Sequence, residues 1–228
     1  PFHPQWGIRA CMKRGGDLVE SLIMENDKGL VVDVGCGSGW VKDKVSDRSR
    51  YIGLDYPVTK MLGYVGPVDV YGDGRSMPLA DNVADVVLLL DVLEHVEDAH
   101  LVLDEVSRVL KPGGRVIVKS PFIYPIHDAP HDFTRWTEYG LGSIFGKDFR
   151  DLRIYQICSD VRVAAMLFGV ALSFSVFQSL KEGRFWVLLL VPVAVVLIAI
   201  INLSAFLWDA LSSSVGRMPA SYVLVARR

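Results

Sequence analysis

The stretch from Leu30 to Trp40, LVVDVGCGSGW, limits the possible folds more than any other part of the chain. Its apolar residues run directly into a turn that contains Gly35, Gly37 and Gly39. An apolar run of this kind is typical of a parallel strand that is buried on both faces. Glycine has no Cβ and tolerates positive φ, so a ligand can lie against the main chain of the turn. The stretch therefore predicts an α/β fold with a ligand-binding turn after a buried strand.

The turn departs from the dinucleotide-binding pattern at one position. That pattern, G-x-G-x-x-G, needs a third glycine where Trp40 stands, which disfavours a nicotinamide oxidoreductase. The sequence instead reads D-x-G-x-G-x-G and resembles motif I of the class I S-adenosylmethionine-dependent methyltransferases. The resemblance implies S-adenosylmethionine as the cofactor and S-adenosylhomocysteine as the product. It places these residues of the motif at the cofactor: Asp33, Gly35, Cys36, Gly37 and Gly39.

Later landmarks follow the order that this resemblance implies. YIGLDY ends a second predicted strand at Asp55, about 20 residues after Gly35, where a βαβ unit brings a carboxylate to the ribose hydroxyls. A surface aspartate that starts the turn before Pro57 is the alternative. LKPGG followed by a β-branched strand is also typical of the family. The resemblance places four more residues at the cofactor: Tyr56, Asp73 at the adenine amino group, Gly74 beside the ring, and Asp91 near the methionine end.

These landmarks together predict the fold class and the domains. We expect a Rossmann-like, seven-stranded methyltransferase sheet, with the resemblance covering residues 29–158 and the last strand. The predicted methyltransferase domain comprises residues 1–158 and 221–228, in which residues 1–26 form an N-terminal cap segment.

The segment after the fifth predicted strand, residues 121–141, mixes ionisable and aromatic side chains. Ligands of open α/β sheets bind beyond the carboxyl ends of the strands, so this segment should line the acceptor side. It resembles the H-x-x-P-x-D-[FY]-x-R-[FYW]-T segment of some of these enzymes. We predict His127 and His131 as candidate bases with Asp132 as their orienting partner. The predicted acceptor-binding residues are Tyr124, Arg135 and Trp136.

Two other interpretations of this segment remain open. One is a structural pair between Asp132 and Arg135 beside a threonine that caps a helix. The other is a divalent-metal site formed by the histidines and aspartates of residues 127–132. The segment offers no helical or hairpin template for metal ligands, so we predict no metal site.

About 60 residues separate the last two predicted strands, far more than an ordinary connection. Two stretches in it, Val163 to Leu180 and Phe185 to Trp208, contain no charged residue, and each approaches the roughly 20 residues that span a bilayer. Ala165, Gly169 and Ser173 form a stripe of small residues that lets membrane helices approach closely. We predict that residues 159–220 form an inserted hydrophobic helical hairpin embedded in a membrane. A soluble hairpin in a dimer interface is the alternative.

The predicted function is that of a membrane-anchored methyltransferase acting on a small or lipid-linked acceptor, with O-methylation favoured. Arginines that flank the hairpin favour a cytoplasmic catalytic domain, and the three cysteines are too scattered for a disulfide framework. The formal charge of -2, without a basic run, gives no reason to expect a nucleic-acid partner. The lipid bilayer and a second copy, joined through the hairpin, are the expected partners. The alternative is a non-catalytic membrane scaffold or binding module that retains the fold.

Overall fold

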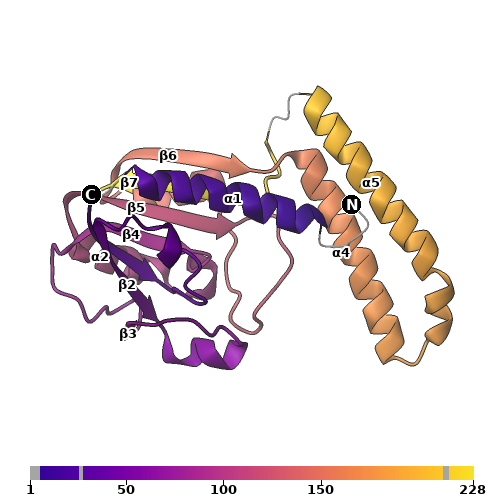
Figure 1. Cartoon of the computed structure of the whole chain (residues 1–228), viewed down its shortest axis with the longest axis horizontal. Coiled ribbons are helices and arrows are strands. Elements are labelled where there is room, and N and C mark those ends of the chain that lie inside the picture. The colour runs from indigo at the N-terminus through magenta and orange to yellow at the C-terminus, as the bar shows by residue number, and fades with distance from the viewer. Residues whose placement is uncertain (1–5, 26–27, 213–215) are drawn as a thin grey trace. The chain divides into compact units, whose positions relative to one another are not determined.

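The computed structural model describes residues 6–25, 28–212 and 216–228 (Figure 1). The first five residues and Asn26 of the predicted cap segment lie outside the described residues. The chain divides into two compact units. The sheet unit comprises residues 15–122, 126–155 and 221–228, and the hairpin unit comprises residues 1–14, 123–125 and 156–220.

A single seven-stranded sheet has the strand order β3-β2-β1-β4-β5-β7-β6, which confirms the predicted Rossmann-like methyltransferase sheet. The pairs among β1 to β5 are parallel, and β7 runs antiparallel to β5. The strands are β1 (Gly29–Val34), β2 (Ser49–Asp55), β3 (Val70–Tyr71), β4 (Ala84–Leu90), β5 (Leu110–Pro121), β6 (Arg150–Ile157) and β7 (Ser221–Arg227).

The central strands of the sheet are buried on both faces, as the runs of Val and Leu in β1 and β4 predict. Helix α2 (Ala99–Val109) packs Val102, Val106 and Val109 into the same core. Helix α1 (Trp6–Met24) contributes residues to both units. The sheet unit also contains α3 (Glu138–Phe145) and the 3-10 helices η1 (Lys42–Lys44), η2 (Pro57–Leu62) and η3 (Leu93–His95).

The register of the strands brings their carboxyl ends to one edge of the sheet. Val34 at the end of β1 pairs with Leu54 of β2 and Leu89 of β4, and Leu89 pairs with Val118 of β5. The segments that follow these strands therefore share that edge. This is the edge where open α/β sheets bind their ligands.

The hairpin unit contains α4 (Asp160–Lys181), η4 (Phe185–Leu189) and α5 (Val191–Leu211), which lie between β6 and β7 in the chain, as predicted. The two long helices run side by side (Figure 1). Their most apolar windows have mean hydropathies of 1.9 and 2.4, and only 28% and 17% of these windows are buried. Both helices are long and apolar enough to cross a membrane. An ion pair of 2.6 Å joins Arg162 near the start of α4 to Asp209 near the end of α5.

Two of the three cysteines form a disulfide, although their scattered positions do not predict a disulfide framework. Cys11 of α1 is bonded to Cys158, which follows β6, across a sequence separation of 147 residues. Both lie in a small apolar cluster with Val163 and Met166. Sequence spacing could not reveal this pair, because only the folded hairpin unit brings the two residues together. Cys36 is free and buried.

Candidate active site

The glycine turn after β1 has the main-chain conformation that its sequence predicts. Gly35, Gly37 and Gly39 have φ values of 72°, 50° and 70°. The N–H of Gly35 donates to the carbonyl oxygen of Leu54 at 2.8 Å, which ties the turn to β2. A Cβ on Gly35 would lie 2.6 Å from Cγ2 of Val92, so this position also lacks space for a side chain. Glycine is required here by φ and by packing together.

Asp55 fastens the turn at the end of β2. Its buried carboxylate accepts hydrogen bonds from the N–H of Gly37 at 2.8 Å, the N–H of Tyr56 at 2.7 Å and the hydroxyl of Thr59 at 2.8 Å. It is therefore no surface aspartate. A carboxylate offers about four acceptor positions, so one is left beyond these three. The predicted contact of Asp55 with ribose hydroxyls stays a prediction.

Asp33 and Cys36 are both buried at the turn. The hydroxyl of Tyr51 donates to Asp33 at 2.7 Å, yet burial dominates and raises the pKa of Asp33 to about 7, with the charge of Asp55 adding to the effect. Burial also raises the pKa of the Cys36 thiol to about 12. Cys36 is therefore an unreactive, space-filling side chain, and contact of either residue with the cofactor stays a prediction.

Asp73, the predicted adenine partner, is held by its neighbour Arg75. The guanidinium donates to both carboxylate oxygens, with Nη2 at 2.7 Å from Oδ2, and these bonds lower the pKa of Asp73. Gly74 lies against the core, where an added Cβ would be 3.2 Å from Cγ1 of Val34. Tyr56 is half-exposed beside the turn. An adenine amino group would thus meet a carboxylate whose orientation is already fixed.

Residues 64–67 lie against the glycine turn, which sequence reasoning did not foresee. A Cβ on Gly66 would lie 2.3 Å from the carbonyl oxygen of Gly37, and a Cβ on Gly37 would lie 3.7 Å from Cδ1 of Tyr64. The hydroxyl of Tyr64 donates to Asp128 at 2.6 Å. Residues 64–67 therefore connect the turn with the predicted acceptor segment.

Asp91 follows β4 with a φ of 57°, an uncommon conformation for a side chain other than glycine. Its carboxylate forms an ion pair with the buried Lys119 at the end of β5, and its N–H donates to the Lys119 carbonyl at 2.8 Å. Sequence reasoning missed Lys119. The available signal was a lysine inside the apolar strand RVIVKSP.

Asp132 connects both of its predicted partners in the acceptor segment. Arg135 binds its carboxylate through two nitrogens, with Nη2 at 2.6 Å from Oδ2, and holds its pKa down at about 2. The same carboxylate lies 3.3 Å from Nδ1 of His127 and accepts the N–H of His127 at 3.0 Å. Thr137 caps α3 by accepting from the N–H of Gly140 at 3.0 Å. The structure thus contains the Asp132–Arg135 pair and the threonine cap of the structural interpretation. It also contains the contacts that orient His127.

The other predicted residues of this segment have different surroundings. The exposed ring of His131 lies near Phe133, and the His131 carbonyl, rather than its ring, contacts His95. Trp136 packs against the core of the sheet, and within the described residues its indole nitrogen has no hydrogen-bond partner. Tyr124 belongs to the hairpin unit and is partly buried there.

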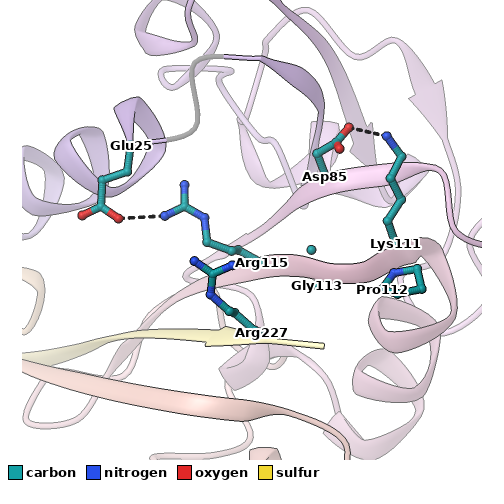
Figure 2. A pocket seen from close by; sticks show the side chains of 8 residues that line it. Glu25, Asp85, Lys111, Pro112, Gly113, Arg115 and Arg227 are labelled. Atoms are coloured by element: carbon teal, nitrogen blue, oxygen red, sulfur yellow. Dashed lines mark hydrogen bonds and ion pairs between the residues drawn. The ribbon is translucent and has the colours of Figure 1, made fainter.

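A polar pocket lies where β4 and β5 begin, at the edge of the sheet opposite the glycine turn (Figure 2). Two ion pairs line it, Glu25 with Arg115 at 2.8 Å and Asp85 with Lys111 at 2.7 Å. Four of the five charged residues that line it thus pair with one another. Because ligands of open α/β sheets bind at the opposite, carboxyl edge, this pocket is not the candidate active site.

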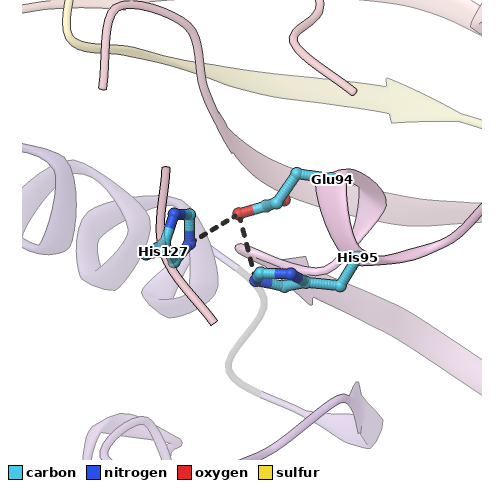
Figure 3. Close-up of side chains that lie close together, drawn as sticks. All are labelled: Glu94, His95 and His127. Atoms are coloured by element: carbon cyan, nitrogen blue, oxygen red, sulfur yellow. Dashed lines mark ion pairs between the residues drawn. The ribbon is translucent and has the colours of Figure 1, made fainter. Parts of the chain in front are cut away.

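Glu94 of η3 lies at the carboxyl edge, is 0% exposed, and faces two histidines. Its Oε1 is 3.8 Å from Nε2 of His95 and 3.9 Å from Nε2 of His127 (Figure 3). Within the described residues, neither carboxylate oxygen has a hydrogen-bond partner. Burial raises the pKa of Glu94 to about 8, and the charge of Asp91 adds to this. The sequence does not indicate this cluster, because residues 126–132 approach η3 only in the fold.

The central part of the sheet unit is similar to known proteins. Residues 32–118 match a family model described as a methyltransferase domain. A probable S-adenosylmethionine-dependent methyltransferase of Mycolicibacterium smegmatis is 38% identical over 96 residues, which cover 40% of this chain and 37% of that protein. A demethylmenaquinone methyltransferase of Bacillus licheniformis is 28% identical over 57% of this chain and 62% of its own length. The matches thus span less than two thirds of either relative.

Solved structures agree on the fold. A putative sarcosine dimethylglycine methyltransferase from Galdieria sulphuraria aligns with a TM-score of 0.56 over 96% of this chain and 85% of its own, at 19% identity. The cyclase SpnF aligns with a TM-score of 0.58 over 94% of this chain and 80% of its own, also at 19% identity. Since the second protein is described as a cyclase, the fold by itself does not decide the reaction.

Proposed function

We propose that this chain, whose residues 32–118 match a family model described as a methyltransferase domain, is a class I S-adenosylmethionine-dependent methyltransferase that transfers a methyl group to a small or lipid-linked acceptor. The observation that carries the proposal is the glycine turn after β1. Three of its glycines have positive φ, and the N–H of Gly37 donates a hydrogen bond to Asp55. S-adenosylmethionine supplies an electrophilic methyl group when bound. The protein's part is to hold the acceptor in line with that group, because positioning supplies much of the acceleration.

The acceptor groups around the turn fit this cofactor by their chemistry. The three glycines give the turn its path, and Val92, Tyr64 and Pro67 lie close to where their Cβ atoms would stand. We propose that the remaining acceptor position of Asp55 receives a ribose hydroxyl and that Asp73 receives the adenine amino group. Asp91 would then face the methionine part, with its charge balanced by Lys119.

The acceptor side is proposed to be residues 126–137, with O-methylation favoured. A hydroxyl acceptor must lose a proton, and His127 is the candidate base because Asp132 contacts its Nδ1 at 3.3 Å. Arg135 keeps Asp132 ionised, so Asp132 orients the imidazole and does not take the proton. The exposed His131 ring has no such partner in the described part of the chain, so its predicted role as a second base has less support.

We propose that α4 and α5 anchor the chain in a bilayer. Phe174, Phe177, Trp186, Leu189 and Ile200 are all more than half exposed, which suits lipid and does not suit a buried soluble core. An anchor of this kind would bring the enzyme to a lipid-linked acceptor. Extraction of membranes at alkaline pH tests this, because a spanning hairpin stays in the membrane fraction and a peripheral one is released.

The side of the membrane is a separate question. Arg150, Arg153, Arg162 and Arg217 favour the cytoplasmic side for the catalytic domain. The Cys11–Cys158 disulfide is instead typical of an oxidising compartment. Membrane-impermeant alkylation of intact cells, before and after reduction, separates the two: a cytoplasmic domain is protected from the reagent, and an external one is labelled only after reduction.

The first test of the function is calorimetric titration of S-adenosylmethionine and S-adenosylhomocysteine into the detergent-purified chain. We expect saturable binding of both, no binding of NAD, and loss of binding in Asp55→Ala. The matched control is Thr59→Val, which removes a hydroxyl from the same carboxylate and leaves the N–H contact of Gly37 in place. A folded chain that binds neither ligand would favour the scaffold alternative, and binding without methyl transfer to any acceptor would favour a binding module.

A further inference from the structure

We propose that Glu94, His95 and His127 together bind one divalent transition-metal ion, through Oε1 of the glutamate and Nε2 of each histidine. These three ligand atoms come from two segments that meet only in the fold, η3 and residues 126–132. All three atoms lie within 4.8 Å of one another. This cluster differs from the metal site considered for residues 127–132 alone, because two of its three ligands come from outside that segment.

The distances suit a shared ion better than direct hydrogen bonds. Oε1 of Glu94 lies 3.8 Å and 3.9 Å from the two Nε2 atoms. A hydrogen bond that involves nitrogen is usually about 2.7 to 3.2 Å long, and a contact of about 3.6 Å is no longer one. Ligands about 2.0 to 2.2 Å from a zinc ion in tetrahedral geometry are about 3.3 to 3.6 Å apart. The two carboxylate–imidazole distances exceed this range by only a few tenths of an ångström, and the site is complete once the side chains also bring the two Nε2 atoms into the same range.

Both imidazoles are held in the orientation that a metal ligand needs. Nδ1 of His95 lies 2.6 Å from the carbonyl oxygen of His131, and Nδ1 of His127 lies 3.3 Å from Oδ2 of Asp132. Each Nδ1 thus faces an acceptor and carries the proton, so that Nε2 of a neutral ring presents a lone pair. A carbonyl or carboxylate in this position is the usual outer partner of a metal-bound histidine. Figure 3 shows both rings directed toward the same carboxylate oxygen.

The buried carboxylate supplies an independent observation. Glu94 is 0% exposed, and neither of its oxygens has a hydrogen-bond partner among the described residues. An unsatisfied buried polar group costs about 1 to 3 kcal/mol, and more when it is charged. Protonation of Glu94 would remove its charge, but neither imidazole Nε2 lies close enough to accept a hydrogen bond from the protonated carboxyl group. An ion between the three atoms would satisfy the buried carboxylate.

The ligand set indicates the class of ion. Two imidazole nitrogens and one carboxylate oxygen suit zinc and other first-row transition metals, whereas magnesium and calcium prefer oxygen ligands throughout. The side chains of His95 and His127 are 24% and 27% exposed, so one side of the cluster remains open. Three protein ligands with an open position are typical of a site that binds water or a substrate oxygen.

Ion binding does not depend on methyl transfer, but its catalytic consequence rests on the proposed function. A hydroxyl oxygen of the acceptor bound at the open position would lose its proton to water more readily. Its lone pair would then form the bond to the methyl carbon, while the carbon–sulfur bond breaks with its electrons moving to sulfur. His127 would serve as a ligand in this case, and the ion would replace it as the group that activates the hydroxyl. Asp132 orients His127 in either case.

The test is calorimetric titration of zinc into the full chain in detergent, after removal of metals with a chelator. We expect one ion per chain, tighter binding as the pH rises from 6 to 8 because ligand protons are released, and no binding of magnesium. Glu94→Gln, His95→Ala and His127→Ala should each weaken binding by about 100-fold or more, and Asp132→Asn by about 10- to 100-fold. Cobalt, titrated in parallel, should give visible absorption bands that the ligand variants lose.

The matched controls are His131→Ala, which keeps the carbonyl that contacts His95, and His100→Ala on the exposed face of α2. Both should bind zinc within twofold of the unchanged chain. The inference is overturned if the folded chain takes up no zinc, or if the controls weaken binding as much as Glu94→Gln. Circular dichroism establishes folding, and His127→Ala decides the case if Glu94→Gln does not fold. S-adenosylmethionine titrated into the same samples shows whether the cofactor proposal fails separately.

Discussion

Replacement of Gly35 by alanine tests whether the glycine turn is constrained as the structure shows. Two separate costs apply at this position. The φ of 72° disfavours any residue with a Cβ by about 1 to 2 kcal/mol. The new Cβ would lie 2.6 Å from Cγ2 of Val92, and such overpacking costs about 1 to 3 kcal/mol. The expected loss of stability is therefore about 2 to 5 kcal/mol.

Two other glycines separate these costs. Gly63 has a φ of 91° and no atom within 4 Å of an added Cβ, so Gly63→Ala should show only the conformational cost. Gly142, inside α3, has an ordinary φ and open space, so Gly142→Ala should stabilise the chain by about 0.5 to 1 kcal/mol. The order of stability should be Gly142→Ala, unchanged chain, Gly63→Ala and Gly35→Ala.

Thermal melting followed by circular dichroism in one detergent measures this order. For a chain of this size, 1 kcal/mol corresponds to roughly 2 to 4 °C. Gly35→Ala should therefore melt at least about 4 °C below the unchanged chain. Val92→Ala removes the methyl group that clashes, so in the double variant the effect of Gly35→Ala should shrink toward that of Gly63→Ala. Equal melting of Gly35→Ala and Gly63→Ala would refute the packing argument.

Three further predictions concern the rest of the chain. Cys11→Ser should lower stability by about 2 to 5 kcal/mol, and a reducing agent should lower the melting temperature of the unchanged chain but not of the variant. The pKa of Asp33 is about 7 in the folded chain, against 3.8 for an unperturbed aspartate, so the unfolded chain loses this proton first and stability should fall as the pH rises from about 4 to 7. Asp33→Asn should remove this fall, as measured by urea unfolding across that range. Glu94→Gln should likewise reduce the loss of stability between about pH 4.5 and 8 in metal-free protein, because the folded pKa of Glu94 is about 8.

The sequence predicts those features that depend on neighbouring residues. The D-x-G-x-G-x-G motif indicates positive φ at Gly35 because a turn between a buried strand and the next segment is a local property. The apolar runs likewise predict the central strands, and the length of residues 159–220 predicts an insertion before the last strand. In each case the signal and the structure that it predicts occupy the same short stretch of the chain.

The contacts that the sequence did not reveal join distant stretches. The pair of Asp91 with Lys119 depends on the register of β4 against β5. The approach of His127 to Glu94 depends on how the segment after β5 returns to η3. Glu94 and His127 are separated by 33 positions in the sequence, and Cys11 and Cys158 by 147. No spacing rule connects residues so far apart, so neither contact could be predicted from spacing. The sequence showed which side chains carry chemistry, and the fold determines which of them meet.

The carboxyl edge of the sheet concentrates negative charge in a way that connects the two proposals. Asp33 and Asp55 lie close enough for the charge of Asp55 to raise the pKa of Asp33, and the charge of Asp91 acts in the same direction on Glu94. Lys119 offsets only part of this repulsion, because it pairs directly with Asp91. A positive charge brought to this edge would therefore be stabilised by carboxylates that the fold has already desolvated. The sulfonium of S-adenosylmethionine and a divalent ion at Glu94 both supply such a charge, and each would favour the ionised form of a neighbouring carboxylate.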